Sequence, residues 1–368
     1  MQKNCLRCER TAPDNNLFCQ DPHCPAEMSP FILEHGEWLD DIEIIRPLVI
    51  LLTSALYEAR RNGSIILLKV AHPAKEHVER LVREALLLQG LALGRHPEPC
   101  LPNLLPGYAG ASIRKAPYGK TTLSGHLFYY CLFEHFAGSP LRDLLLKNPQ
   151  LGVPHIGGLM VNLARAVAVL QTRGKIGTLH CGLCPQVVLV RLDERTAPKV
   201  LLIDLGIASE LDDLEENWYR NAVPPAYTAP ELIGTPSRAT YATDVYGLGL
   251  IFNELLNGQP VFPLAYQNDA DVYTMVLQKQ SSEMALGRAG DVTMLVKLAN
   301  ETMSLDPAGR PQSSKALYQA LRAPEIFGQN PFIAPTRLRP RAELIALGVL
   351  LCAALAVTII VLLVATKG

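Results

Sequence analysis

The chain has 368 residues, of which 49% are hydrophobic and 19% are charged, and its formal net charge at pH 7 is −1. This is the composition of a globular protein, and the small net charge does not favour nucleic acid or an anionic membrane surface as a partner. The polar first ten residues contain no apolar run, so we do not expect a cleaved secretory signal. The nine cysteines are an odd number, which favours a reducing compartment and a metal site over a disulfide framework.

Shifts in composition divide the chain into four predicted parts. Residues 1–30 are polar and rich in cysteine, and residues 39–323 alternate strand-like and helix-like apolar patterns. A linker containing proline and arginine covers residues 324–341, and a long apolar run covers residues 342–366. We therefore expect one large α+β domain between a small metal-binding module and a membrane segment.

The N-terminal part predicts a structural zinc ribbon. Cys5 and Cys8 form one pair and Cys19 and Cys24 form a second, wider pair, so four thiolates could surround a zinc ion. His23 is an alternative to Cys24 as the fourth ligand. So short a segment cannot bury enough apolar surface to fold alone, and a metal would supply the missing free energy. The alternative is a tail without fixed structure; a zinc ribbon in this position would contact a protein partner.

In its first part, the large domain has an apolar strand that contains a charged residue. Residues 65–70 (IILLKV) are strand-like and contain Lys69, and about 15 residues later an amphipathic helix carries Glu84. A buried lysine facing a glutamate is costly unless the two side chains pair. Each residue alone would be interpreted as an ordinary surface charge. The interpretation as a buried pair therefore depends on the segments that follow.

Five further segments follow in a fixed order along the chain. They are residues 128–145 (FYYCLFEHFAGSPLRDLL), 203–208 (IDLGIA), 229–231 (APE), 243–262 (TDVYGLGLIFNELLNGQPVF) and 305–314 (LDPAGRPQSS). Together with the lysine strand and its helix, they resemble a protein kinase of the eukaryotic (Hanks) type across about residues 39–323. The resemblance implies a bilobal fold, with a β-rich small lobe at residues 39–133 and a helical large lobe at residues 137–323.

The resemblance also assigns roles to single residues. Lys69, Glu84 and Asp204 stand where the family binds nucleotide and one Mg²⁺; the alternative is that they persist only as charge pairs that bridge the lobes. Two further contacts of the large lobe are implied.

One implied contact joins Asp244 to the backbone of the catalytic loop, and the other joins Arg310 to Glu231. Phe133 would hold the family's gatekeeper position, and Glu134 would lie in the hinge between the lobes.

The catalytic loop departs from the family pattern. The family's HRDLKPENxLx reads HCGLCPQVVLV here, from His180 to residue 190. Gly182 replaces the aspartate that accepts the substrate proton, Cys184 replaces the lysine that neutralises the transferring phosphate, and Val187 replaces the asparagine that holds the second Mg²⁺. Glycine cannot deprotonate a hydroxyl and valine cannot ligate a hard cation, so we predict no catalytic residue in this loop.

The loop that covers the phosphates in the family departs as well. Its three glycines fall on Val49, Leu51 and Ser54. Side chains at these positions would crowd the close approach of backbone to phosphate that glycine permits. Bulky aliphatic residues there could fill part of the nucleotide cleft instead.

The final apolar run predicts a transmembrane helix. Residues 344–364 contain no charge, and about 21 residues at about 1.5 Å each span the roughly 30 Å hydrocarbon core. Arg337, Arg339 and Arg341 precede the run and only Lys367 follows it, so the positive-inside bias places the N-terminal domains in the cytoplasm. The alternative is a buried core helix.

Two functions follow as hypotheses. The first is a membrane-anchored pseudokinase that acts by binding or scaffolding other proteins, with structural Zn²⁺ near the N-terminus. The second is an atypical Ser/Thr kinase of low activity, which would use ATP and Mg²⁺ through Lys69, Glu84 and Asp204. The general base alone contributes on the order of 10²–10⁴ in rate, so even the second hypothesis predicts slow phosphoryl transfer.

Overall fold

The computed structural model describes most of the predicted large domain. The described residues are 3–4, 11–12, 32–92, 98–123, 125–172, 177–193, 196–207, 209–210, 223–233, 239–262, 269–278, 292–328 and 330–333. The chain divides into two compact units, residues 1–333 and residues 334–368. The second unit, which contains the predicted transmembrane helix, lies outside the described residues. Of the predicted zinc ribbon, only strands β1 (Lys3–Asn4) and β2 (Thr11–Ala12) are described, and they pair antiparallel.

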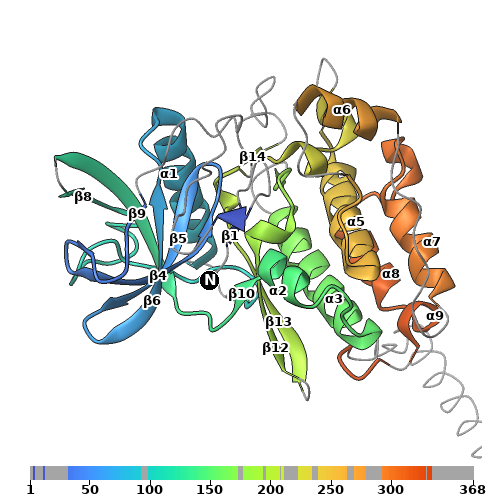
Figure 1. The fold of residues 1–368 in the computed structure, drawn as a ribbon, viewed down its shortest axis with the longest axis horizontal. Helices are drawn as coiled ribbons and strands as arrows, with labels where there is room; N and C mark the ends of the chain where they lie inside the picture. The colour runs from blue at the N-terminus through green and yellow to red at the C-terminus, as the bar shows by residue number, and fades with distance from the viewer. Residues whose placement is uncertain are drawn as a thin grey trace, which may run out of the picture. The chain divides into compact units, whose positions relative to one another are not determined.

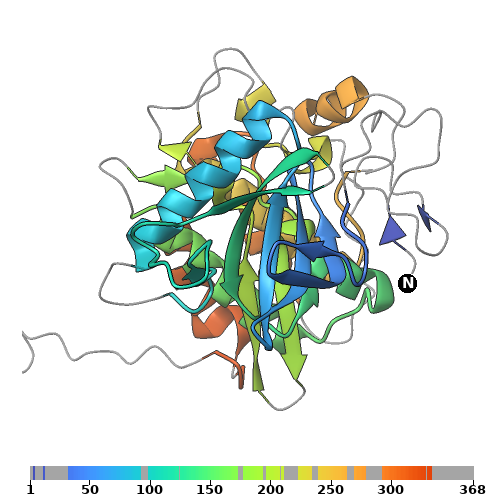
Figure 2. The same ribbon diagram turned by 90° about the vertical axis from the view of Figure 1, so that its left-hand side faces the viewer.

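The small lobe is an antiparallel sheet with one helix against it (Figures 1 and 2). Along the sheet the strands follow the order β3-β4-β5-β6-β9-β7, and β8 pairs with β9. The helix is α1 (Lys75–Ala92), which packs against β6, β7 and β9. The strands are β3 (Trp38–Leu39), β4 (Ile42–Ile50), β5 (Ser54–Arg61), β6 (Ser64–Ala71), β7 (Leu104–Leu105), β8 (Gly119–Leu123) and β9 (His126–Glu134).

A tight turn sets the register of the two strands that carry Lys69. Asn62 and Gly63 both have positive φ, and the strands pair from Arg61 opposite Ser64. A two-residue hairpin turn in which both central residues have positive φ strongly favours the pair Asn-Gly. The turn therefore fixes which residue of β5 lies opposite each residue of β6, and Leu56 lies opposite Lys69.

Both faces of β6 are buried, but in different apolar clusters. Ile66, Leu68 and Val70 belong to a cluster confined to the outer face of the small-lobe sheet. Leu67 belongs to a larger cluster that continues through α1 into the large lobe. Because side chains alternate along a strand, neighbouring leucines of this strand serve two separate cores.

The large lobe is mainly helical, with short strands at its border with the small lobe (Figure 1). The helices are α2 (Leu141–Lys147), α3 (Val153–Leu170), α4 (Pro230–Ile233), α5 (Tyr241–Asn257), α6 (Asp269–Gln278), α7 (Thr293–Thr302), α8 (Ser314–Leu321) and α9 (Pro324–Phe327). The strands are β10 (Ser139–Pro140), β11 (Thr178–Leu179), β12 (Val188–Asp193), β13 (Thr196–Leu202) and β14 (Ser209–Glu210). Short 3₁₀ turns occur at Pro185–Val187, Leu205–Ile207, Pro225–Tyr227 and Pro307–Gly309.

Helix α5 forms the centre of the large lobe. Its N-terminus has a capping box in which the side chain of Thr240 accepts a hydrogen bond from the helix backbone and the side chain of Thr243 accepts one from the backbone amide of Thr240. Its C-terminus ends on Gly258 in the left-handed conformation. Nearly all of the helix is buried, which is consistent with a sequence that is apolar around most of its circumference.

Helix α3 passes a length and composition test for a membrane span. It is the one helix among the described residues that does so, and 56% of it is buried inside the protein. It packs against α5, α8 and β13, so in this fold α3 is a core helix. The bilobal α+β architecture that the sequence predicts is confirmed.

Candidate functional site

Three charged residues from three elements meet between the lobes. Lys69 of β6 donates hydrogen bonds to Glu84 of α1 and to Asp204, which follows β13; the Nζ–Oδ1 distance to Asp204 is 2.5 Å. All three side chains are buried. The predicted pairing of Lys69 with Glu84 is confirmed, and the structure adds Asp204 to the same group.

Burial and mutual attraction act against each other in this triad. Burial disfavours the charge on Lys69, but the carboxylates of Asp204 and Glu84 outweigh it and raise the pKa of Lys69. Burial raises the pKa of the Glu84 carboxyl, against the attraction of Lys69. The second oxygen of Glu84 accepts a hydrogen bond from the Leu205 backbone amide at 3.0 Å. The triad therefore fixes α1 to both the sheet and the segment that follows Asp204.

The catalytic loop is held by a buried carboxylate of helix α5. Asp244 accepts hydrogen bonds from the backbone amides of His180 at 3.1 Å and Cys181 at 2.8 Å, and from the side chain of Gln171 at 3.3 Å. The predicted contact between Asp244 and the loop backbone is confirmed. Burial raises the pKa of Asp244 to about 6, against these hydrogen bonds. Helix α5 therefore fixes the backbone of the catalytic loop through this carboxylate.

The imidazole of His180 is a structural part of the same loop. It is fully buried, and its Nδ1 accepts a hydrogen bond from the Gly182 amide at 3.2 Å. Its Nε2 then carries the hydrogen and faces the Ile203 carbonyl at 3.4 Å. Burial lowers the pKa of His180 to about 4, so the ring is neutral at physiological pH.

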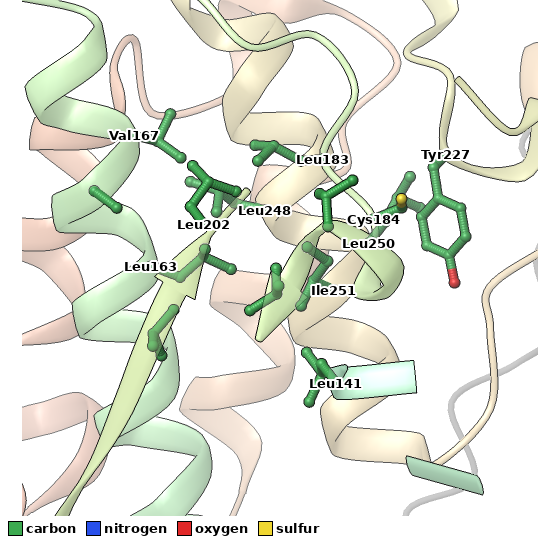
Figure 3. Close-up of a cluster of buried hydrophobic side chains, with 14 of the residues drawn as sticks. Leu141, Leu163, Val167, Leu183, Cys184, Leu202, Tyr227, Leu248, Leu250 and Ile251 are labelled. Atoms are coloured by element: carbon green, nitrogen blue, oxygen red, sulfur yellow. The ribbon is translucent and has the colours of Figure 1, made fainter. Parts of the chain in front are cut away.

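The three substituted loop positions offer no group that could act in phosphoryl transfer. Gly182, Cys184 and Val187 are all buried. Figure 3 shows Cys184 among the aliphatic side chains of the large lobe, with Tyr227 nearby. Burial raises the pKa of the Cys184 thiol to about 12, so it stays neutral. These residues extend the hydrophobic core into the place where the family carries a carboxylate, an ammonium and an amide.

The residues at this site do not fit the two-metal arrangement of the family. Asp204 is retained, but its partner position holds the aliphatic side chain of Val187, which is 3% exposed. In the part of the chain that the structure describes, no group of three or more His, Cys, Asp or Glu could hold a metal ion. Oxygen ligands are what Mg²⁺ requires, and here one carboxylate already bonded to Lys69 is what remains.

The turn between β4 and β5 occupies the place of the phosphate-covering loop. It is closed by a hydrogen bond from the Leu51 amide to the Ser54 carbonyl at 2.8 Å. The Nε2 of His72, just after β6, lies 2.9 Å from the Leu51 carbonyl and donates to it. The side chain of Leu51 is buried in the core cluster that the two lobes share. The role of His72 could not be predicted, because a histidine at a strand end has no characteristic sequence pattern.

Two buried ion pairs support the large lobe around the site. Arg310 makes a bidentate contact with Glu231, at 2.7 and 2.9 Å, and lies 4.8 Å from the ring centroid of Tyr246. The predicted pairing of Arg310 with Glu231 is confirmed.

The second ion pair was not foreseen from the sequence. Arg142 of α2 donates to Glu254 of α5 at 2.7 Å and to the Tyr227 hydroxyl at 2.6 Å, and Tyr227 in turn donates to Glu254 at 2.6 Å. All three side chains are buried. Three residues separated by up to 112 positions form this network, so no local pattern marks it.

The predicted zinc ligands and the membrane segment cannot be placed in this site. Cys5, Cys8, Cys19, Cys24 and the alternative ligand His23 lie outside the described residues, as does the apolar run of residues 342–366.

Comparison with known families agrees with the geometry. A family model described as the protein kinase domain matches residues 120–321, which is more than half of the chain. The chain therefore belongs to the protein kinase family. The match includes the catalytic loop, Asp204 and the Arg310–Glu231 pair.

Several curated proteins are similar to the chain at low identity. The serine/threonine-protein kinase RUNKEL of Arabidopsis thaliana is 27% identical over 261 residues, which cover 70% of this chain and 17% of that protein. Mitogen-activated protein kinase 15 of Caenorhabditis elegans is 28% identical over 56% of this chain and 41% of that protein. Mitogen-activated protein kinase 12 of Oryza sativa is 28% identical over 61% of this chain and 36% of that protein. The chain thus spans less than half the length of these relatives.

Proposed function

We propose that this protein is a pseudokinase: a protein kinase domain that binds or scaffolds other proteins and does not transfer phosphate. The observation that carries the proposal is the buried, apolar catalytic loop at Gly182, Cys184 and Val187. Among the described residues, Asp244 is the carboxylate bonded to the loop backbone, and its oxygens already accept hydrogen bonds from the amides of His180 and Cys181 and from the Gln171 side chain. Positioning and charge stabilisation are nearly all of the catalysis in phosphoryl transfer, so their loss removes the activity.

The test is phosphate transfer by the full-length protein in detergent. With radiolabelled ATP and Mg²⁺, we expect no incorporation of label into the protein itself or into a generic acceptor protein. Lys69→Met is the matched variant, because it removes the lysine of the triad. Robust transfer by the wild type that Lys69→Met abolishes would overturn the proposal.

The intact triad of Lys69, Glu84 and Asp204 supports a second candidate, a Ser/Thr kinase of low activity. Loss of a general base alone typically costs on the order of 10²–10⁴ in rate, which still leaves measurable turnover. The same assay distinguishes the two candidates, because a slow kinase gives weak label that rises with time and disappears in Asp204→Ala.

A membrane anchor is part of the proposal. The uncharged run within residues 342–366 is long enough to cross a bilayer, and the arginines just before it favour a cytoplasmic kinase domain. An anchor would hold the binding domain at the membrane surface, where it would meet partners that are also confined there.

The N-terminal segment is proposed as a zinc ribbon that recognises a partner. The pairing of β1 with β2 supports it, because Lys3 opposite Ala12 and Asn4 opposite Thr11 bring together the chain on both sides of Cys5 and Cys8. Purified protein should contain one zinc per chain, and Cys5→Ser with Cys8→Ser should lose it. A wild-type protein without zinc would contradict this part of the proposal.

A further inference from the structure

The face of the small-lobe sheet that carries Lys69 is filled with leucine. Leu67 lies two residues before Lys69 and thus on the same face of β6, and Leu56 of β5 lies directly opposite Lys69. Since Lys69 bonds to Asp204 of the large lobe, this face is the small-lobe wall of the cleft between the lobes.

No water-sized space adjoins the leucines that line this cleft. Leu56, Leu67 and Leu189 of β12 are each 0% exposed. All three belong to one buried cluster that runs without interruption from the small lobe to the large lobe. Binding sites for small molecules are usually preformed cavities of several hundred Å³, and a cavity of that size would leave these side chains accessible.

The charged end of the cleft is also occupied. The ammonium of Lys69 is 2% exposed and already donates to the two carboxylates of Glu84 and Asp204. The third N–H of this buried ammonium is the donor left for a phosphate, and a phosphate there would face the repulsion of both carboxylates.

The turn that would cover a phosphate is bonded down instead. His72 holds the carbonyl of Leu51, and the His72 amide donates to the Thr53 carbonyl at 3.0 Å. The Leu51 side chain is 5% exposed and packs into the same cluster as Leu56 and Leu67.

A cavity lined by described residues lies at the outer edge of this region. It has a volume of about 360 Å³ and is lined on the small-lobe side by Arg46, Leu48 and Glu58 and on the hinge side by Phe136 and Gly138. Leu56, Leu67 and Lys69 do not line it. This cavity is therefore a partly polar opening at the edge of the cleft, whose interior is filled by leucine side chains.

We propose that Leu51, Leu56 and Leu67 occupy the space that a nucleotide would need, so that the two lobes stay closed without a nucleotide. The surface of the domain that binds partners then keeps one conformation, and ATP does not change its affinity for them. This goes beyond the loss of phosphoryl transfer, because a kinase domain can lose transfer and still bind ATP. Binding of ATP without transfer would defeat this inference and leave the pseudokinase proposal intact.

The first measurement is the melting temperature of the full-length protein in detergent, with ATP, ADP or adenosine at millimolar concentration, with and without Mg²⁺. A ligand that binds only the folded state raises the melting temperature in proportion to the logarithm of its concentration. We expect no shift with any of the three. A rise in the melting temperature of the wild type would overturn the inference.

The second measurement compares two leucines that are neighbours in sequence and equally buried. Leu67→Ala opens space in the cleft, whereas Leu68→Ala opens the same space in the cluster on the opposite face of β6. Both variants should melt at a lower temperature than the wild type, because each leaves a cavity in a core. Adenosine should raise the melting temperature of Leu67→Ala alone.

If Leu67→Ala does not fold, Leu67→Val provides a smaller opening at the same position. A gain of adenosine binding in Leu68→Ala equal to that in Leu67→Ala would contradict the assignment. So would the absence of a gain in both Leu67 variants.

Discussion

The ammonium of Lys69 is shared by two buried carboxylates, and this makes it the most consequential single charge in the domain. We expect Lys69 to contribute to the stability of the fold. If Lys69 were removed, Glu84 and Asp204 would be left as a buried pair of like charges.

Lys69→Met is therefore expected to destabilise the fold by about 3–5 kcal/mol, the usual cost of leaving a buried charge without its partner. Chemical denaturation monitored by fluorescence would measure it. Lys75→Met is the control, because the Lys75 side chain is 88% exposed and pairs with Glu79 on the surface of α1; surface substitutions usually change stability by less than about 0.5 kcal/mol. Equal effects in the two variants would show that the triad does not stabilise the domain.

The imidazole of His72 gives the domain a dependence on pH. Burial lowers its pKa to about 4; the Leu51 carbonyl and Asp204 act against this shift, while His77 and Lys69 add to it. An unfolded histidine titrates near 6.5. Between about pH 6.5 and pH 4 the unfolded state binds more protons than the folded state, so the free energy of unfolding falls as the pH falls through this window.

His180 adds to this effect and Asp244 opposes it. Burial also lowers the pKa of His180 to about 4, whereas it raises the pKa of Asp244 to about 6, so that the folded state takes up a proton at Asp244 as the pH falls from about 6. The lowered pKa of His72 alone contributes about 3 kcal/mol at the acid end of the window. In a denaturation series from pH 7 to pH 4, His72→Gln should show a shallower loss of stability than the wild type. An unchanged slope would contradict the role of His72.

At the residue scale, the sequence predicted the contacts that belong to a family motif and missed those that do not. Lys69 with Glu84, Asp244 with the loop backbone, and Arg310 with Glu231 could each be inferred before the structure. The bond of His72 to Leu51 could not, because it depends on how the β4–β5 turn folds and no residue type signals that.

Helices α4 and α5 are joined to the end of the domain by one arginine. Arg310 lies between the elements, bonding Glu231 of α4, the Ala242 carbonyl of α5 and the carbonyls of Ser304 and Leu305. A planar guanidinium can satisfy all of these acceptors at once, which an ammonium cannot.

Arg310→Lys is accordingly expected to lower the free energy of unfolding by about 2 kcal/mol or more, because a lysine leaves buried acceptors without donors. Thermal and chemical denaturation would measure the loss. Arg60→Lys is the matched control, since Arg60 pairs with Glu43 and its side chain is 47% exposed. A variant at position 310 as stable as the control would contradict the role given to this arginine.

At the element scale, the strand that carries Lys69 and the helix that carries Glu84 could be predicted because their apolar patterns are local signals. The filling of the cleft could be predicted only in part. Leu51 stands at a position where the family carries glycine, which indicates crowding there. Leu56 and Leu67 are ordinary residues for a buried strand, so their role appears only when the lobes come together.

At the scale of the whole molecule, the proposed membrane anchor predicts where the protein is found after cell fractionation. The proposed anchor within residues 342–366 predicts that the full-length protein sediments with membranes and resists extraction by alkaline carbonate. Removal of residues 334–368, a unit of its own, should move the protein to the soluble fraction. Removal of residues 1–30 is the control and should leave it with the membranes. A full-length protein in the soluble fraction would show that the apolar run does not anchor the chain.

For the whole molecule, we propose that a kinase fold surrounds a catalytic loop that cannot transfer phosphate. The most direct test is the intact mass of the purified protein after long incubation with ATP and Mg²⁺, beside Lys69→Met treated in the same way. We predict that neither protein gains the mass of a phosphoryl group. A wild-type protein that gains one or more phosphoryl groups while Lys69→Met gains none would contradict it.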